Sequence, residues 1–435
     1  MKNGNNSFFV RIIKVIGVLL SDKSLEIISY CINKDIFFLT LIKYLTKYYY
    51  GGIIGLGSGI IKKRKFLDQN YNGNEHPYVN FLDINKNEKK YKIAVVVPRM
   101  ANGEVGGAER FHLGLTNSLN TATTSAELIQ VMINESSFES IEDSYLRCYN
   151  LDLSEYDAVI STKAPTYIVR HPNHLCYLQH TIRIFYDMFD KQFPDPDQTV
   201  CKQRDMILRI DSEALKYPGI KKIFSQGYEI RDRLLKWNSL ESEVLHPAIA
   251  MPCTKPNNYE YIFMPGRLHI WKRVDLLIKA MRYVQYPVHL KIAGTGEDEE
   301  RLQAMAGSDD RIEFLGHVSD EELSQLYANA LVVSFVPIRE DYGYITIEAF
   351  AHEKPIITCK DSGEPLQFIK HGINGFVVDP NPKEIAKAIE YFILNPEQAK
   401  TMGNKGSQDI NHIKWTNISQ KILYILQKES KLKCG

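Results

Sequence analysis

Two acidic residues, Glu340 and Glu348, stand on either side of a glycine that precedes a predicted helix. The apolar run Leu331–Val336 predicts a strand, and Gly343 comes just before a helical stretch at residues 344–352. Free amides at a helix N-terminus suit a phosphate group, whereas carboxylates suit hydroxyl groups. The spacing therefore predicts a ligand that is part phosphate and part polyol.

Further motifs surround this segment. In chain order they are Gly266-Arg267, Lys272-Arg273, Ala293-Gly294-Thr295-Gly296, Leu315-Gly316-His317-Val318, Lys354-Pro355-Ile356-Ile357-Thr358, Ser362-Gly363-Glu364-Pro365 and Gly372-Ile373-Asn374-Gly375-Phe376-Val377. In this order, over residues 261–378, they resemble the retaining GT-B glycosyltransferases called family 4, or glycosyl transferases group 1. The resemblance implies a hexosyltransferase-type enzyme. Such an enzyme moves a sugar from a nucleoside diphosphate sugar to an acceptor hydroxyl and leaves the anomeric configuration unchanged.

The departing nucleoside diphosphate carries negative charge that fixed cations and amides stabilise better than water. Arg267 follows a strand end and Lys272 precedes the next helix, and in the family these positions contact the donor phosphates. The resemblance places Glu348 on the ribose hydroxyls, with two free oxygens as acceptors, and Glu340 beside the transferred sugar ring. The alternative is a surface basic pair and two helix-terminal charges that hold no ligand.

The predicted donor-binding set is completed by Gly294, Val318, Gly343 and Tyr344. Asp341 adds a third acid where most members of the family have a small residue. Arg273 is expected to be a solvent-facing neighbour of Lys272. No cofactor is expected, because the nucleotide sugar is a substrate. No metal is expected either, since Asp195-Pro196-Asp197 lies in a proline-containing loop that favours an ordinary turn.

In the first half of the chain, residues 103–110 resemble the glycine-rich loop that opens the first helix in this family. The amides of Gly106 and Gly107 are expected to face the phosphates or an acceptor, although such glycines are frequent for structural reasons alone. His180 follows a predicted strand, where family members often place a histidine that contacts the sugar. A structural histidine is the alternative. The predicted catalytic residues are Glu340, His180, Arg267 and Lys272, and the resemblance implies a leaving-phosphate oxygen as proton acceptor.

These residues need a scaffold, and from residue 91 short apolar runs alternate with helical stretches, which is typical of parallel sheets with crossover helices. The first series has strands at residues 92–97, 158–161, 176–178 and 222–224 and helices at 107–119, 201–216 and 228–236. The second has strands at residues 261–264, 289–292, 312–315, 331–333, 355–357 and 376–378. The predicted fold class is α/β, with two Rossmann-like doubly wound domains facing a cleft in the GT-B arrangement.

The turn-rich segment 247–259 marks the boundary between the two series. We predict an acceptor-side domain at residues 91–250 and a donor-binding domain at 251–410. At residues 411–435 the resemblance implies a helix that crosses back to the first domain. Ligands of doubly wound sheets bind beyond the carboxyl ends of the strands, so the expected site lies between the domains.

Residues 1–90 are predicted to form an N-terminal extension and linker. Residues 1–65 carry eleven Lys or Arg against three acids, a net charge of +8, which leaves −7 for the rest of a chain of net charge +1. This basic, aromatic, helical segment is interpreted either as a cap on its own domain or as an interfacial helix pair on an acidic membrane surface. A nucleic-acid partner is not predicted, because the chain is not basic overall.

The chain has 435 residues, 44% of them hydrophobic, and seven scattered cysteines without a C-x-x-C pair. The hydrophobic content predicts sizeable cores, and the scattered cysteines favour a protein of the reducing cytoplasm. We also expect peripheral attachment to the inner face of the membrane. Neither a signal peptide nor a membrane-spanning helix is expected. The expected acceptor is a surface glycan, a polysaccharide or a lipid-linked oligosaccharide. Two alternatives stay open: a sugar-nucleotide-binding protein without transferase activity, and a sugar-nucleotide epimerase on the same fold.

Overall fold

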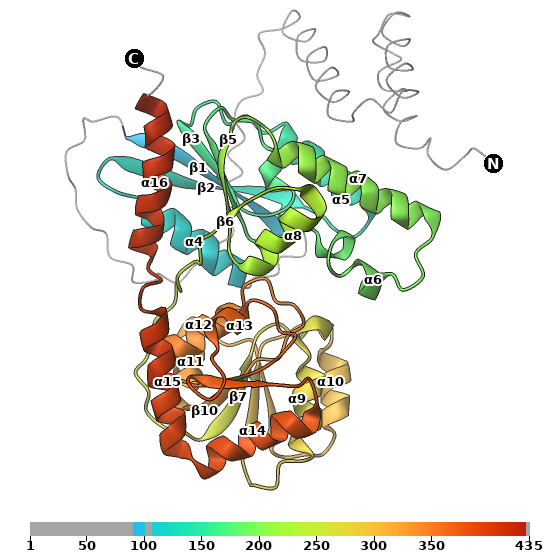
Figure 1. Cartoon of the computed structure of the whole chain (residues 1–435), viewed down its shortest axis with the longest axis vertical. Coiled ribbons are helices and arrows are strands. Elements are labelled where there is room, and N and C mark those ends of the chain that lie inside the picture. The colour runs from blue at the N-terminus through green and yellow to red at the C-terminus, as the bar shows by residue number, and fades with distance from the viewer. Residues whose placement is uncertain (1–89, 101–106, 432–435) are drawn as a thin grey trace, which may run out of the picture. The chain divides into compact units, whose positions relative to one another are not determined.

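The computed structural model describes residues 90–100 and 107–431 of the chain. The N-terminal extension up to residue 89 and residues 101–106 of the glycine-rich loop, Gly106 included, lie outside this part. The described part contains two six-stranded parallel sheets with helices packed on them (Figure 1). The predicted α/β class with two doubly wound domains is confirmed.

The first sheet has the strand order β2-β1-β3-β4-β5-β6. Its strands are β1 (Tyr91–Met100), β2 (Thr124–Ile133), β3 (Ala158–Ser161), β4 (His174–Leu178), β5 (Ile220–Ser225) and β6 (Glu243–Val244). Its helices are α4 (Gly107–Leu119), α5 (Phe138–Tyr149), α6 (Phe189–Gln192), α7 (Gln198–Leu215) and α8 (Tyr228–Asn238). Strand residues such as Val95 and Ile160 are fully buried in one core with Phe111 of α4, and this apolar burial holds helix and sheet together.

The strand β2 was not among the predicted strands. It lies at the edge of the sheet and pairs with β1, so that Glu127 and Gln130 are exposed. The predicted strands were continuous apolar runs, which is the pattern of parallel strands covered on both faces. An edge strand with charged and amide side chains lacks that pattern.

The second sheet has the strand order β12-β11-β10-β7-β8-β9. Its strands are β7 (Tyr261–Pro265), β8 (Leu290–Ala293), β9 (Ile312–Gly316), β10 (Ala330–Ser334), β11 (Ile356–Cys359) and β12 (Gly375–Val378). Its helices are α9 (Val274–Met281), α10 (Glu299–Ala306), α11 (Asp320–Asn329), α12 (Tyr344–Ala351), α13 (Pro365–Phe368), α14 (Pro382–Leu394) and α15 (Pro396–Ile410). Two separate apolar cores, one containing Ile262 and Ile389 and the other Phe263 and Phe350, pack against the sheet.

The chain order of the second sheet reverses between β7 and β10, which are neighbours although β8 and β9 come between them in the sequence. Open α/β sheets bind ligands beyond the carboxyl ends of the strands at such a reversal. The turn after β7 contains Arg267 and Lys272, and the loop after β10 contains Glu340. The topology therefore brings these predicted site residues to one edge of one sheet.

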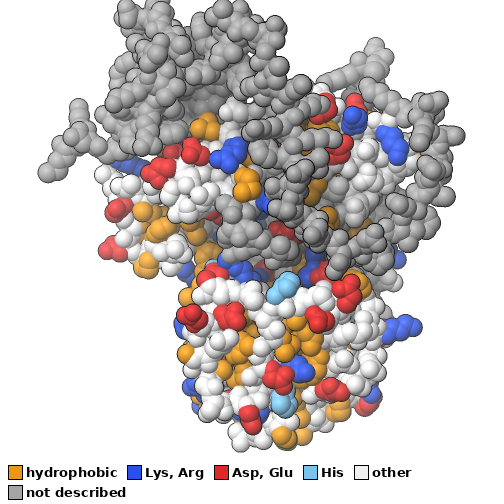
Figure 2. All heavy atoms as spheres, turned by 180° about the vertical axis from the view of Figure 1, so that it is seen from behind, with side chains coloured by type: hydrophobic (Ala, Val, Ile, Leu, Met, Phe, Trp, Pro, Cys, Tyr) orange, Lys and Arg blue, Asp and Glu red, His pale blue; other side chains and the backbone are white. Residues whose placement is uncertain are grey.

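The last helix, α16 (Trp415–Lys431), packs on the first sheet's half of the molecule (Figure 1). Ile422 and Leu426 share a core with Phe111 of α4, and Asn173 Nδ2 donates a hydrogen bond of 3.0 Å to the Leu426 carbonyl oxygen. Figure 2 shows acidic and basic side chains interspersed over the described surface on one face of the molecule. No helix in the described ranges is long and apolar enough to span a bilayer.

Candidate functional site

Three glycines lie at the carboxyl ends of neighbouring strands in the second sheet. Gly266 and Gly294 follow β7 and β8, Gly316 ends β9, and all three have positive φ, at +126°, +135° and +66°. Gly266 N donates to Ala293 O at 2.8 Å, and Gly294 N donates to Gly316 O at 2.7 Å. A Cβ on Gly294 would lie 2.1 Å from Gly266 O, so only glycine permits this approach. The close packing of these turns sets the start of the segment that carries Arg267 and Lys272.

Gly294→Ala is expected to destabilise the fold by at least about 2 kcal/mol, because the strained φ and the contact with Gly266 O both oppose a side chain. The matched control is Gly372→Ala, where φ is +74° and nothing lies within 4 Å of the added Cβ. Urea unfolding followed by circular dichroism measures both variants. Equal losses of unfolding free energy would contradict the importance of the Gly294–Gly266 approach.

Lys272 and Glu340 form the central ion pair of the site. Lys272 ends a 3₁₀ turn (Ile270–Lys272), and its Nζ donates to Glu340 Oε2 at 2.7 Å. The two side chains are 23% and 20% exposed, so a ligand can reach the pair while the surroundings limit its hydration. The structure thus brings together a cation and an acid that are 68 residues apart in the sequence.

Arg273 was expected to face solvent, and this expectation is wrong. Its side chain is 12% exposed and donates to the carbonyl oxygens of Val336 and Pro337, both at 2.7 Å, while pairing with Asp361. These bonds fasten the chain after β10 to the turn that carries Lys272. Arg273 therefore supports the geometry of the Lys272–Glu340 pair.

Arg267 is not joined to that pair in the structure. Its side chain is 50% exposed and donates to Glu297 Oε2 at 3.1 Å. His269 Nε2 also lies 3.2 Å from the Glu297 carboxylate. Arg267 thus lies on the predicted turn but points to a different acid.

The α12 N-terminus adjoins Glu340. Gly343 caps the helix with φ of +76°, and a Cβ there would lie 2.9 Å from the Phe335 ring, which explains the glycine. The backbone of Glu340 is held on both sides, because its N–H donates to Ser362 O at 2.8 Å and its carbonyl accepts from Glu364 N at 2.9 Å. The loop after β11 therefore fixes the main chain at Glu340.

Glu348 lies in the second turn of α12, 4% exposed. It was expected to have two free oxygens, but both already have partners: Tyr327 Oη donates to Oε2 at 2.7 Å, and Arg110 Nη1 lies 3.4 Å from Oε1. Burial raises the pKa of Glu348, and Arg110 and the Tyr327 hydroxyl oppose this shift. Arg110, on α4 of the first domain, also pairs with Asp320 at the start of α11. A carboxylate oxygen accepts more than one hydrogen bond, so a ligand on Glu348 either shares Oε1 with Arg110 or displaces it.

His180 follows β4 in the first domain. Its Nδ1 lies 2.7 Å from the Thr181 carbonyl oxygen, which only accepts, so Nδ1 carries the hydrogen and Nε2 carries the lone pair. Burial first, and then the Lys163 charge, lower the pKa of His180 to about 3. His180 is thus a neutral acceptor near neutral pH.

His180 is expected to contribute no inflection to the pH dependence of turnover between pH 5 and pH 8, because it stays neutral throughout this range. His180→Asn is expected to lower turnover by a similar factor at each pH in this range. The measurement is kcat against pH for the two proteins. An inflection near pH 6.5 that disappears in the variant would show that His180 titrates at its ordinary value.

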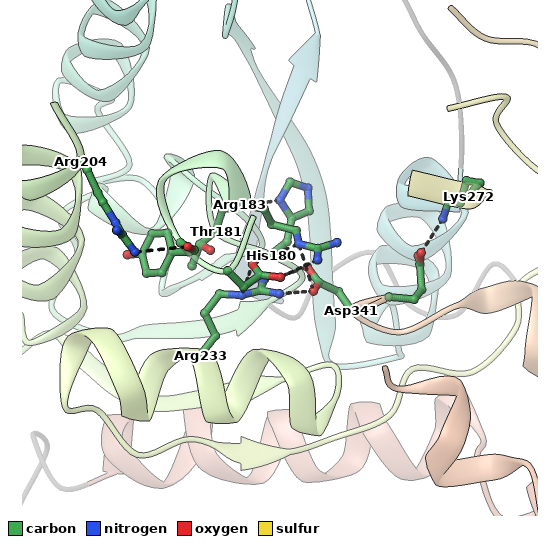
Figure 3. A network of polar contacts seen from close by, with 10 residues as sticks. His180, Thr181, Arg183, Arg204, Arg233, Lys272 and Asp341 are labelled. Carbon is green, nitrogen blue, oxygen red and sulfur yellow. Dashed lines mark hydrogen bonds and ion pairs between the residues drawn. The ribbon is translucent and has the colours of Figure 1, made fainter. Parts of the chain in front are cut away.

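Asp341, the extra acid, contacts the first domain (Figure 3). Arg233 of α8 donates to Asp341 through both terminal nitrogens, with Nη1 3.0 Å from Oδ2, and Arg183 Nε lies 3.7 Å from Oδ1. Burial disfavours the Asp341 charge, but Arg183 and Arg233 outweigh it and lower the pKa of Asp341 to about 2. Asp341 is therefore bound by arginines and is not an additional acid for a ligand.

The remaining predicted residues are placed as follows. Val318 is half-buried in the loop between β9 and α11, and Tyr344 begins α12 with a buried hydroxyl that has no hydrogen-bond partner. Gly107 is the first residue of α4, and Gly106 lies outside the described residues. Sequence reasoning missed Arg110, Arg183 and Arg233, which all join the two domains.

The model of the family described as "Glycosyl transferases group 1" matches residues 251–409. Among curated proteins, the human "Alpha-1,3/1,6-mannosyltransferase ALG2" is 34% identical over 131 residues, which are 27% of this chain and 31% of that protein. An "Uncharacterized glycosyltransferase" of Haemophilus influenzae is 30% identical over 179 residues, 39% of this chain and 50% of that protein. The matched segments thus span half or less of these relatives.

Among solved structures, a sucrose-phosphate synthase from Thermosynechococcus elongatus superposes with a TM-score of 0.62 at 16% identity, covering 79% of this chain and all of that one. The Anabaena protein Alr3699/HepE in complex with UDP and glucose gives 0.59 at 17% identity, covering 78% of this chain and all of that one. At these identities the likeness shows the fold, which is GT-B as predicted.

Proposed function

We propose, from the premise that residues 251–409 form a domain of the glycosyl transferases group 1 family, that this protein is a retaining glycosyltransferase of family 4. It moves a sugar from a nucleoside diphosphate sugar to a hydroxyl of a glycan or lipid-linked acceptor. The observation that carries the proposal is the 2.7 Å pair of Lys272 and Glu340 beyond β7 and β10. A cation suited to a leaving diphosphate there adjoins an acid suited to a sugar.

The donor is held by groups from both domains. Its diphosphate lies against Lys272 and the first amides of α12, where the charge on the departing oxygen is stabilised, and Arg267 adds a second cation from the same turn. The ribose hydroxyls donate to Glu348, either beside Arg110 or in its place. A sugar hydroxyl donates to His180 Nε2. His180 acts here as the neutral acceptor that its buried surroundings favour.

In the reaction, the bond between the anomeric carbon and the phosphate oxygen breaks, and the acceptor oxygen bonds to the same face of that carbon. The acceptor proton passes to an oxygen of the leaving phosphate. Glu340, beside the sugar ring, offsets positive charge that develops at the anomeric carbon. Lys272 and the helix amides stabilise the charge of the diphosphate without a cofactor or metal. Contact between the domains excludes water and limits hydrolysis of the donor.

The test is a panel of uridine, guanosine, adenosine and thymidine diphosphate sugars. The correct donor raises the melting temperature by mass action. Turnover is then followed as nucleoside diphosphate release with glycan or lipid-linked acceptors, and NMR of the product reports its anomeric configuration. An inverted product would overturn retention. Binding without turnover would favour the sugar-nucleotide-binding protein, and a changed sugar without acceptor would favour the epimerase.

The proposal extends to location. We infer that the +8 charge of residues 1–65 attaches the protein to anionic lipid on the cytoplasmic face of a membrane, near a lipid-linked acceptor. Co-sedimentation with phosphatidylglycerol vesicles, but not with phosphatidylcholine vesicles, is the expected result. Equal recovery with both vesicles would contradict this attachment.

A further inference from the structure

The helix α8 of the first domain contacts the second domain at two places, both next to Glu340. The first place is Asp341, which follows Glu340 in the chain and is bound by Arg233. The second is Glu364, whose backbone N–H donates to the Glu340 carbonyl oxygen at 2.9 Å. One helix therefore holds both the sequence neighbour and the hydrogen-bond neighbour of the predicted catalytic acid.

The contact at Asp341 is buried and electrically balanced. The Arg233 side chain is 1% exposed, and its Nε also lies 2.9 Å from Asp187 Oδ1. Arg183 pairs with the same Asp187 at 2.6 Å and lies 3.7 Å from Asp341. Two carboxylates and two guanidiniums thus form a closed cluster, which we call the Asp341 cluster: Arg183, Asp187, Arg233 and Asp341. Figure 3 labels Arg183, Arg233 and Asp341 of this cluster. Removing one partner leaves a buried charge unpaired.

The contact at Glu364 uses the first turn of α8. The Glu364 side chain is fully buried, and its Oε2 accepts from the backbone N–H of Glu229 at 3.1 Å. Its Oε1 lies 2.8 Å from His246 Nε2. A Cβ on Gly227, the cap of α8, would lie 2.5 Å from the Glu364 carboxyl carbon, so glycine is needed for this approach. The acid occupies the helix N-terminus, where its charge is favoured.

The first domain also contacts the other partner of the catalytic pair. The Arg183 guanidinium lies 5.4 Å from the centre of the Trp271 ring, and Trp271 directly precedes Lys272. The Trp271 carbonyl oxygen in turn accepts from Ile338 N at 2.9 Å, two residues before Glu340. The Asp341 cluster therefore contacts both segments whose side chains form the Lys272–Glu340 pair.

We propose that Arg233 and Asp341 are positioning residues, which hold the Glu340 carboxylate against Lys272 when the two domains are in contact. The inference rests on the proposed function for its catalytic consequence. Glu340 is hydrogen-bonded to Ser362, Glu364 and Lys272 of its own domain. The first domain acts on it through Asp341 and Glu364, and through the charge of Arg183 in the Asp341 cluster. Contact between the domains thereby completes the catalytic pair, and a separated second domain holds the donor without the same geometry.

The test uses Asp341→Asn in the full chain, with Arg233→Lys as the conservative second variant. Asp341→Asn is expected to lower kcat about 10- to 100-fold, with nucleotide affinity within about threefold of the wild type, because Glu348 and the first amides of α12 remain in place. Arg233→Lys keeps one charged donor, so it is expected to keep more of the turnover. The double variant is expected to lose no more than the more severely affected single variant, because both act through one contact.

The matched control is Asp309→Asn, which breaks a two-bonded pair with Arg311 at 2.9 and 2.8 Å before β9, at the opposite edge of the same sheet. Its kcat is expected to match the wild type. A loss of kcat in Asp309→Asn equal to that in Asp341→Asn, or unchanged kcat in Asp341→Asn, would overturn the inference while leaving the proposed function standing.

A second readout does not depend on turnover. The acetylation rate of Lys272 by acetic anhydride, measured by mass spectrometry, reports how tightly Glu340 holds its ammonium group. The rate is expected to rise several-fold in Asp341→Asn, while Lys279, which pairs with Asp275 on α9, reacts as in the wild type. An unchanged Lys272 rate overturns the inference. A raised rate in a protein that transfers no sugar would instead contradict the proposed function alone.

Discussion

Lys272→Ala is expected to lower the turnover number by about 10²- to 10³-fold, with little change in donor affinity, because its ammonium group acts mainly on charge that develops as the diphosphate departs. The variant also leaves Glu340 without its 2.7 Å partner. Steady-state kinetics at saturating donor measure kcat, and calorimetric titration with the nucleoside diphosphate measures affinity.

The control for this prediction is Lys279→Ala. Lys279 also forms a 2.7 Å pair with a carboxylate, Asp275, but lies on α9 beyond the turn that holds Lys272. Wild-type turnover in Lys279→Ala and a large loss in Lys272→Ala are the expected pair of results. If Lys272→Ala turns over at the wild-type rate, Lys272 does not belong to the site.

Glu348→Gln is expected to weaken nucleotide binding about 10- to 100-fold, because the ribose hydroxyls lose a charged acceptor. The substitution keeps the shape of the side chain and one acceptor oxygen for the Tyr327 hydroxyl, so the buried site is not emptied. Titration with the nucleoside diphosphate alone is sufficient, since the contact with the ribose does not involve the acceptor substrate.

Glu321→Gln is the companion variant. Glu321 is an exposed acid in the first turn of α11, next to Asp320 in the sequence. Its nucleotide affinity is expected to equal that of the wild type. If Glu348→Gln also binds the nucleotide as tightly as the wild type does, Glu348 is not the acceptor of the ribose hydroxyls.

The central pair was predictable because its signals are local. Lys272 follows an apolar strand and a turn, Glu340 precedes a glycine and a helix, and parallel strands place both at one edge of a sheet. The order of the surrounding motifs then distinguished them from ordinary surface charges. The placement of Lys272 and Glu340 at one edge of one sheet was therefore available before the structure, whereas the ion pair between them was not predicted.

The arginines that join the domains were not predictable. On α8, Arg231 and Arg233 stand two residues apart in one charged helix, yet the Arg231 side chain is 40% exposed and that of Arg233 is 1% exposed. The difference arises because Asp341, 108 residues later, lies against Arg233. The residue pattern of one helix does not show which of its side chains will face the other domain.

The same limit explains the position of Arg273. It was expected to face solvent but holds the chain after β10, whereas the Arg267 side chain on the same turn is 50% exposed and pairs with Glu297. Both follow strand β7 within a few residues. Which way each side chain points depends on loops that come much later in the sequence.

The return of α16 to the first sheet has a consequence for protein engineering. Because α16 lies in the core around Phe111, the polypeptide crosses between the halves twice, once between β6 and β7 and once between α15 and α16. A chimaera that exchanges donor preference must therefore replace an internal cassette with two junctions, near residues 250 and 412. A simple fusion at one junction would leave a foreign terminal helix where Ile422 and Leu426 now pack.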